Sequence, residues 1–229
     1  MPGALIVGSS DGIGLALAGA LVDAGWQVVG LSRSPSPLSR PSYRHRVVDV
    51  RDPDYGERVA ESWRELESGD ACIYCAGIGE SLEPSHFERE VEVFEVNLQG
   101  AVRTAAAVVP AMVAAGRGHF VALSSQADNF LNADAPSYSA SKAGLSSYLE
   151  GLALALRPRG VHVTNIRFGF VATKMAKSEV RPFEISAERA ARLVIRCLKK
   201  RPIRYTYPKR MALLLWFLRW PPRLRVWWS

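Results

Sequence analysis

The chain has 229 residues, of which 48% are hydrophobic, so it is long enough to bury the core of one ordinary α/β domain. Its formal net charge is +7, but the segment from Lys199 to Ser229 holds nine basic residues and no acidic ones. Subtracting these nine leaves −2 for the rest of the chain, whereas a nucleic-acid interface needs a basic face across the domain. We therefore expect no nucleic-acid partner.

Cysteine and histidine usage points to a reducing compartment and away from a metal centre. The three cysteines lack disulfide-framework spacing, and no basic segment precedes the first apolar run, which argues against a signal peptide. Cys72 and Cys75 lie three apart in an expected buried strand, which places their side chains on opposite faces. The four histidines show no ligand spacing. We expect a cytoplasmic protein without a catalytic metal.

Short apolar runs alternate with helix-period stretches along most of the chain. Strands are predicted at Ala4–Val7, Val28–Leu31, Val47–Val50, Ala71–Tyr74, His119–Leu123 and Val161–Phe168. Helices are predicted at Ile13–Ala24, Tyr55–Leu66, Val91–Ala115 and Tyr138–Leu156. Because right-handed crossovers lay helices over both faces of a parallel sheet, this order predicts a single doubly wound, Rossmann-type α/β domain. Polar loops at 32–43 and 128–137 follow strand ends, the edge where such sheets bind ligands.

A glycine-rich turn follows the first predicted strand directly. Its sequence, Gly8-Ser9-Ser10-Asp11-Gly12-Ile13-Gly14, has the spacing G-x-x-x-G-x-G and leads into a helix. Such a turn lets the backbone approach a pyrophosphate, and the free amides at the helix N-terminus attract its negative charge. By itself the turn is also compatible with a plain tight turn, but its position at the first strand-to-helix connection favours a dinucleotide.

Several later motifs follow the turn in the order typical of the short-chain dehydrogenase/reductase family. Together with the turn, they make the chain resemble that family. They are Asp49-Val50, Cys75-Ala76-Gly77, Asn97, Ser124-Ser125 and Tyr138-Ser139-Ala140-Ser141-Lys142. The resemblance implies cofactor contacts from Gly8, Ser10, Gly12, Ile13, Gly14, Arg33, Asp49, Val50, Ala76, Gly77, Asn97, Tyr138, Lys142, Val171 and Thr173. Two residues depart from the family pattern, because Cys75 stands in place of Asn and Phe168 in place of Pro.

The catalytic prediction centres on Tyr138 and Lys142, which are four residues apart in a predicted helix and so project from one face. A free phenol titrates near ~10, and we expect the nearby ammonium to lower the pKa of Tyr138 toward neutrality so that it can transfer a proton. The resemblance implies that Ser125 donates a hydrogen bond to the substrate oxygen. It also implies that Lys142 binds the nicotinamide ribose and that Asn97 holds a proton-relay water near Lys142.

The second predicted strand favours NADP over NAD. An acidic residue near its end would accept bonds from the adenosine ribose, but no acid lies between Val28 and Arg46, and Arg33 follows the strand. A guanidinium suits a 2′-phosphate, although Arg33 as an ordinary solvated charge stays open and Asp11 beside the turn counts mildly against a second phosphate.

Together these features predict an enzyme that transfers a hydride between NADP(H) and a small-molecule carbonyl compound or secondary alcohol. Two alternatives remain: a non-catalytic NADP-binding sensor or scaffold, which would be expected to lack Ser125, Tyr138 or Lys142, and an epimerase or lyase on the same fold. Apolar residues in the loops expected to shape the substrate pocket, Phe130, Leu131, Met175 and Phe183, favour an apolar substrate.

We expect a catalytic domain at residues 1–208 and a basic, tryptophan-rich tail at 209–229. Alanine-rich stretches in the helices Val91–Ala115 and Tyr138–Leu156 predict a homodimer or homotetramer. In the tail, basic residues flank Trp and Leu over an apolar run too short to span a bilayer, which is typical of a helix lying on a membrane surface. A helix that closes over the substrate pocket or pairs with a partner subunit is the alternative.

Overall fold

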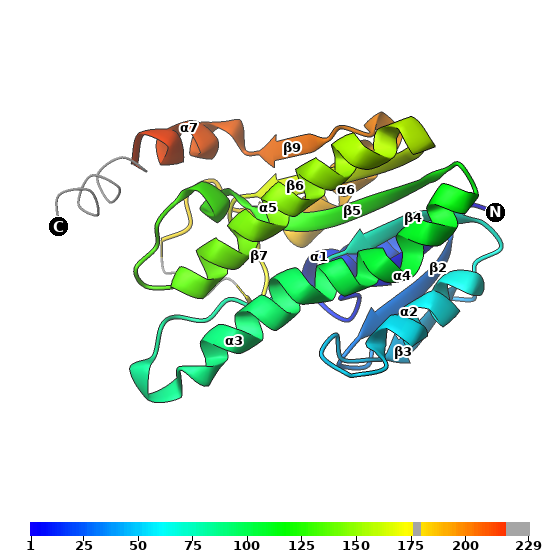
Figure 1. Cartoon of the computed structure of the whole chain (residues 1–229), viewed down its shortest axis with the longest axis horizontal. Coiled ribbons are helices and arrows are strands. Elements are labelled where there is room, and N and C mark those ends of the chain that lie inside the picture. The colour runs from blue at the N-terminus through cyan, green and yellow to red at the C-terminus, as the bar shows by residue number, and fades with distance from the viewer. Residues whose placement is uncertain (176–179, 219–229) are drawn as a thin grey trace.

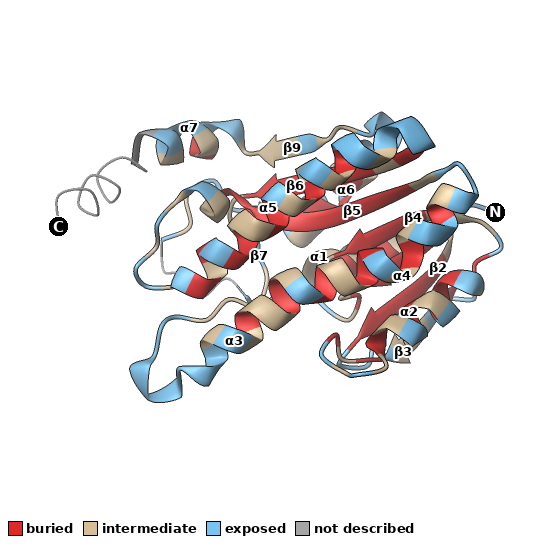
Figure 2. Ribbon diagram, in the orientation of Figure 1, coloured by how far each residue is buried: buried red, intermediate tan, exposed pale blue. Residues whose placement is uncertain are grey.

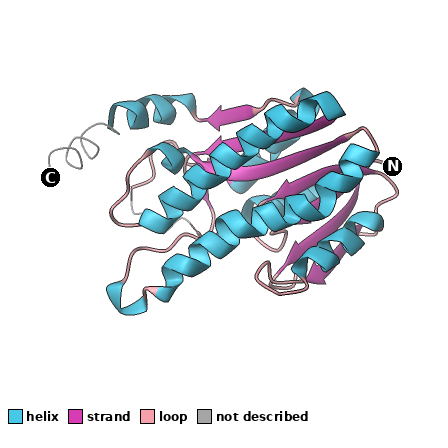
Figure 3. Cartoon of the chain, in the orientation of Figure 1, coloured by secondary structure: helices cyan, strands magenta, loops and turns pink. Residues whose placement is uncertain are grey.

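The computed structural model of the protein describes residues 1–175 and 180–218. Its centre is one parallel sheet of seven strands in the order β3-β2-β1-β4-β5-β6-β9 (Figures 1 and 3). These strands are β1 (Gly3–Val7), β2 (Gln27–Ser32), β3 (Tyr43–Val47), β4 (Gly69–Tyr74), β5 (Gly118–Ser125), β6 (Val161–Phe168) and β9 (Arg204–Tyr207). The chain winds outward from β1 to β3 and then from β4 to β9, which confirms the predicted doubly wound architecture.

Helices cover both faces of the sheet (Figure 1). One face packs under α2 (Tyr55–Arg64), α4 (Gly100–Ala114) and α5 (Pro136–Leu156), and the other under α1 (Gly12–Asp23) and α6 (Ala187–Lys200). Alternation along β1 supplies both cores, because Leu5 and Val7 enter the first and Ala4 and Ile6 enter the second. The strands are therefore the most buried part of the molecule, as Figure 2 shows.

The third strand and the long central helix differ from the sequence predictions. β3 is Tyr43–Val47 rather than Val47–Val50, because an edge strand alternates polar residues outward, and the apolar signal came from Val48 and Val50, which enter the core just after the strand. The helix predicted at Val91–Ala115 consists of α3 (Glu88–Phe94), a π-helical segment (Glu95–Gln99) and α4. Such single-turn π segments often lie at functional sites.

Several elements follow β6. A small sheet pairs β7 (Val171–Ala172) with β8 (Ile185–Ser186), and α7 (Lys209–Leu218) ends the described chain. Short helical turns lie at Pro84–His86, Gln126–Asn129 and Arg157–Arg159. Residues 219–229 of the predicted tail lie outside the described residues. No helix of the described residues is long and apolar enough to cross a membrane.

The cysteines have the predicted arrangement. Cys72 belongs to one core and Cys75 packs against the other, so the C-x-x-C spans the sheet instead of forming a pair. Cys72, Cys75 and Cys197 are all free. Within the described ranges, no group of three or more His, Cys, Asp or Glu residues could hold a metal ion.

Candidate active site

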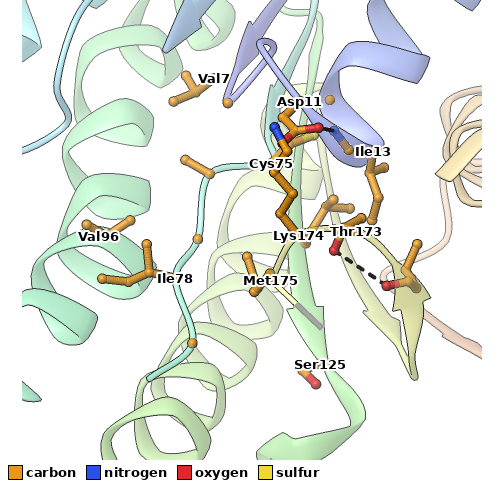
Figure 4. Close-up of a pocket in the computed structure, with 18 of the residues that line it drawn as sticks. Val7, Asp11, Ile13, Cys75, Ile78, Val96, Ser125, Thr173, Lys174 and Met175 are labelled. Carbon is orange, nitrogen blue, oxygen red and sulfur yellow. Dashed lines mark hydrogen bonds and ion pairs between the residues drawn. The ribbon is translucent and has the colours of Figure 1, made fainter. Parts of the chain in front are cut away.

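A cleft of about 750 Å³ opens at the carboxyl ends of the strands. It lies at the switch point between the neighbouring strands β1 and β4, from which the chain winds outward in both directions. The glycine turn forms one end and β5 with α5 forms the other (Figure 4). The predicted site residues that line it are Gly8, Ser10, Gly12, Ile13, Gly14, Arg33, Asp49, Val50, Ala76, Gly77, Ser125, Tyr138, Lys142, Val171 and Thr173. Asn97 is fully buried behind the cleft wall.

Backbone contacts dictate the glycines of the β1–α1 turn. Gly8 has φ +87°, and a Cβ atom there would lie 2.6 Å from the amide nitrogen of Ala76. A Cβ atom on Gly14 would lie 1.9 Å from the carbonyl oxygen of Gly8, so neither position accepts a side chain. Helix α1 begins at Gly12, and its first turn points free amides toward the cleft. The turn thus has the close packing and the partial positive charge that a pyrophosphate requires.

An ion pair crosses the rim beside this turn. Lys174 Nζ lies 3.0 Å from Asp11 Oδ2, and the Asp11 carboxylate also accepts a 2.7 Å bond from the Gly12 amide. The hydrogen bond from Lys174 is the main reason that the pKa of Asp11 is lowered. The pair was not predicted, because its partners are far apart in sequence and the short β7 segment that brings Lys174 back to the turn gives no clear pattern. The Lys174 side chain is 89% exposed, so solvent screens the pair strongly.

At the other end of the cleft, Ser125 at the end of β5 and Tyr138 in the first turn of α5 both line the cleft, near enough for the Ser125 hydroxyl to act on the phenol. Burial of the phenol raises the pKa of Tyr138, and the nearby Ser125 hydroxyl offsets part of that rise. The prediction that Lys142 lowers the pKa of Tyr138 is therefore wrong for this structure. The Lys142 Nζ lies 5.9 Å from the Tyr138 ring centroid and donates instead to the Leu123 carbonyl oxygen at 2.9 Å, so desolvation outweighs its attraction.

Lys142 is itself buried, with 4% of its surface exposed. Loss of hydration lowers its pKa to about 8. Its ammonium also lies against Gly77, where a Cβ atom would be 3.4 Å from Nζ. Lys142 therefore joins the loop that follows β4 to helix α5, within the same cleft.

Asn97, in the π-helical segment, holds the β4 exit loop against α5. Its Oδ1 accepts from the Ile78 amide at 2.8 Å, and its Nδ2 donates to the Ile78 carbonyl at 2.9 Å and to Ser141 Oγ at 3.1 Å. The extra residue of the π turn brings this side chain inward to the loop. Asn97 is thus a positioning residue whose amide is already occupied by protein partners.

A buried polar network lies behind Ser125. Asp128 accepts from Arg167 Nε at 2.6 Å and from Ser146 Oγ at 2.6 Å, and Ser146 in turn bonds Ser124 Oγ at 2.7 Å. The side chains of Arg167 and Asp128 are only 9% and 4% exposed. Sequence reasoning placed Asp128 in a substrate loop, because nothing in the sequence pairs it with a β6 arginine. The network fixes η3 (Gln126–Asn129), β6 and α5 around Ser125.

The end of the cleft beside β2 carries charges of both signs. Arg33, exposed at the end of β2, lines the cleft and contributes to lowering the pKa of Asp49, after the larger effect of the Asp49–Arg51 hydrogen bond. Arg51 holds the Asp49 carboxylate from both oxygens, at 3.1 Å and 2.9 Å. Arg33 therefore remains the cation that faces this end of the cleft.

The loop residues expected at the substrate pocket lie at different places in the structure. Met175 lines the cleft, as Figure 4 shows, whereas Phe183 lines a second groove and Leu131 is exposed. Residues 176–179 of that loop lie outside the described residues. Cys75 and Phe168, the two departures from the family pattern, both line the cleft.

Comparison with known proteins decides the family. The family model described as short chain dehydrogenase matches residues 3–182. The chain belongs to the short-chain dehydrogenase family. An uncharacterized oxidoreductase of Myxococcus xanthus is 32% identical over 91% of this chain and 88% of its own length. A 3-oxoacyl-acyl-carrier-protein reductase of Salmonella typhimurium is 30% identical over 76% of this chain and 75% of its own.

Solved structures support the fold independently. A short-chain dehydrogenase from Streptomyces avermitilis superposes with a TM-score of 0.81 at 23% identity, covering 98% of this chain and 95% of that one. The seven-stranded sheet and its helices are thus those of the family. The protein is an oxidoreductase of this family, whose members use NAD(P).

Proposed function

We propose that this short-chain dehydrogenase interconverts a carbonyl compound and a secondary alcohol with NADP(H), using Tyr138 as the general acid and base. The observation that carries the proposal is that Ser125, Tyr138 and the buried Lys142 line the same cleft as the glycine turn. A proton donor, an oxygen-binding hydroxyl and a buried cation beside one cleft match what carbonyl reduction requires.

The chain's own residues supply binding, orientation and the proton. The Ser125 hydroxyl donates to the substrate oxygen, and the Tyr138 hydroxyl delivers a proton to that oxygen as it gains charge. When bound, the nicotinamide supplies the hydride to the carbonyl carbon in reduction or accepts it in oxidation. Lys142 lies beside Gly77 in the same cleft, where its ammonium would hold the nicotinamide ribose. Asn97 positions the loop that Lys142 packs against.

The charges at the rim of the cleft favour NADP over NAD. Arg33 faces the adenosine end of the cleft, and the nearby Asp49 carboxylate is occupied by Arg51. A guanidinium at that place favours a 2′-phosphate over a ribose hydroxyl. Val171 and Thr173, which line the opposite wall, would hold the nicotinamide end, and Gly8, Gly12 and Gly14 the pyrophosphate.

A panel of apolar ketones, aldehydes, steroids and retinoids, followed at the nicotinamide absorbance, tests the proposal. We expect turnover with NADPH on at least one apolar carbonyl compound. NADPH binding with no turnover on any member of the panel would favour the alternative of a sensor or scaffold, and isomerised product without net cofactor oxidation would favour an epimerase. The presence of Ser125, Tyr138 and Lys142 together in the cleft supports the reductase.

We propose further that two copies pair through α4 and α5. These helices lie side by side on one face of the sheet (Figure 1), and α5 exposes 68% of Leu154 to solvent. A two-fold axis across α4 and α5 would cover this surface and close the assembly. Light scattering should give a dimer or tetramer for the parent, and Leu154→Glu should shift it toward monomer. A monomeric parent at micromolar concentration contradicts the proposal.

A further inference from the structure

Helix α7 presents an apolar surface to solvent. Leu213, Leu214 and Trp216 are 61%, 44% and 47% exposed, whereas Met211 on the inner side is buried. Single exposed apolar residues are ordinary on a protein surface, but three on one ten-residue helix form an exposed apolar patch.

A basic groove adjoins this patch. It has a volume of about 730 Å³ and runs between α6, β9 and the start of α7. Its cationic lining residues are Arg189, Arg196, Lys209 and Arg210. Among the described residues that line it, Glu184 is the one carboxylate, and Arg181 lies 3.0 Å from it. Arg189 donates to the Tyr207 hydroxyl, but no carboxylate is paired with Arg196, Lys209 or Arg210 in the described structure.

An apolar patch beside a row of cations matches the chemistry of an anionic lipid surface. We propose that α7 and the basic groove form a docking surface for a membrane that contains anionic phospholipids. Leu213, Leu214 and Trp216 enter the interfacial region, while Arg196, Lys209 and Arg210 contact the headgroup phosphates. At 1.5 Å per residue the helix is about 15 Å long, roughly half the hydrocarbon thickness, so it lies along the surface.

Charge decides against a second copy of the chain as the occupant. A two-fold contact brings the same surface of each copy together, so the cations of both copies, Lys209 and Arg210 among them, would be gathered in one interface. Like charges at an interface are costly, and the groove supplies no acidic group to offset them beyond the paired Glu184. An anionic surface instead neutralises the cations and covers the apolar patch in one contact.

The docking surface is fixed next to the active site. Gln126 Nε2, one residue after Ser125, donates to the Pro208 carbonyl at 3.1 Å, just before α7 begins. Gly169 lines the cleft, and the Met211 sulfur packs closely on it. A Cβ atom on Gly169 would lie 2.6 Å from that sulfur. Figure 1 shows α7 leaving the sheet at the end of β9, the edge at which the strands meet the cleft. Membrane docking would therefore hold the cleft beside the lipid surface.

Vesicle sedimentation of the full chain tests the proposal without relying on its activity. Vesicles of phosphatidylcholine alone are compared with vesicles that also contain phosphatidylglycerol. We expect binding to the anionic vesicles that weakens as salt is added. The variant Arg196→Gln/Lys209→Gln/Arg210→Gln should lose affinity on the order of 100-fold. Leu213→Ser/Leu214→Ser should lose binding even at low salt, because the apolar contact is gone.

A matched control removes three exposed cations elsewhere. Arg64→Gln/Arg157→Gln/Arg159→Gln changes the net charge equally but lies away from α7, so it should bind like the parent. Equal loss in the control, equal binding to neutral vesicles, or dimerisation through α7 without sedimentation would each overturn the proposal. Tight binding of inorganic phosphate to a protein that never sediments would also overturn it, since the groove would then serve a soluble anion. Circular dichroism confirms that each variant is folded.

Discussion

The two ends of the cleft are built by different means. At the glycine turn, the geometry comes from the backbone, and the side chains that add charge, Arg33 and Lys174, are exposed. At the catalytic end, buried side chains such as Lys142, Asp128 and Arg167 hold one another by hydrogen bonds. Because burial strengthens electrostatic effects and solvent screens them, substitutions should have large effects at the catalytic end and small ones at the cofactor rim.

The largest effect should come from Tyr138→Phe. The change removes the proton donor and little volume, so turnover should fall by about 10²–10⁴-fold while the NADPH affinity survives. Steady-state kinetics and a fluorescence titration on the same preparation measure both. The matched control is Tyr148→Phe, which alters another half-buried tyrosine of α5 that does not line the cleft, and which should keep parental turnover. Near-parental activity of the Tyr138 variant would disprove the mechanism.

The buried ion pair gives the next effect. Asp128→Asn leaves the Arg167 guanidinium without its counter-charge, and removing one partner of a buried pair costs about 3–5 kcal/mol. Urea unfolding measures the loss. The same substitution at Asp54, whose side chain is 46% exposed and pairs with Arg58 across one helical turn at 2.7 Å, should cost only a small fraction of it. Equal costs at the two sites would show that the catalytic end gains nothing from burial.

The buried Lys142 should give a stability that depends on pH. Its pKa falls from 10.5 to about 8 on folding, so below pH 8 the folded chain carries a buried ammonium at a cost in free energy. As pH rises from 8 toward 10.5, the folded protein loses this proton before the unfolded chain does, and the cost shrinks.

Lys142→Met removes that cost and isolates the effect. The variant should be more stable than the parent at pH 7, and this advantage should shrink by about 2 kcal/mol by pH 9.5. Unfolding of both proteins across the range measures the difference, in which all other titrations cancel. A difference that stays constant with pH would mean that Lys142 remains hydrated in solution.

The sequence predicted the sheet better than its edge. Apolar runs located β1 and β4 because both faces of a central strand are buried, so Ala4–Val7 and Ala71–Tyr74 are continuous apolar runs. β3 was displaced because an edge strand exposes Arg44 and Val47, and the following valines carried the apolar signal. The predicted elements ended at Phe168, so α6 and β9 were not anticipated, although α6 has clear helical periodicity in its buried residues.

The candidate site, like the fold, could be predicted only in part from the sequence. Local motifs located the glycine turn and the Tyr138–Lys142 pair, since each lies within one turn or one helix and its spacing is visible in the chain. The Asp128–Arg167 pair joins residues 39 apart, and only the tertiary fold brings them together. The expected fall in the pKa of Tyr138 failed for the same reason, because desolvation depends on the complete fold.

The smallest effect should come from the rim, at Arg33. If its guanidinium meets a 2′-phosphate, Arg33→Ala should weaken NADPH binding by about 1–3 kcal/mol and leave NADH binding nearly unchanged. Its exposure favours the lower end of this range, and added salt should narrow the preference further. Arg40→Ala, an exposed arginine of the same loop that does not line the cleft, is the matched control and should change neither affinity. Equal affinity of the parent for NADPH and NADH would mean that Arg33 is an ordinary solvent-exposed charge. No residue would then support the proposed preference for NADP.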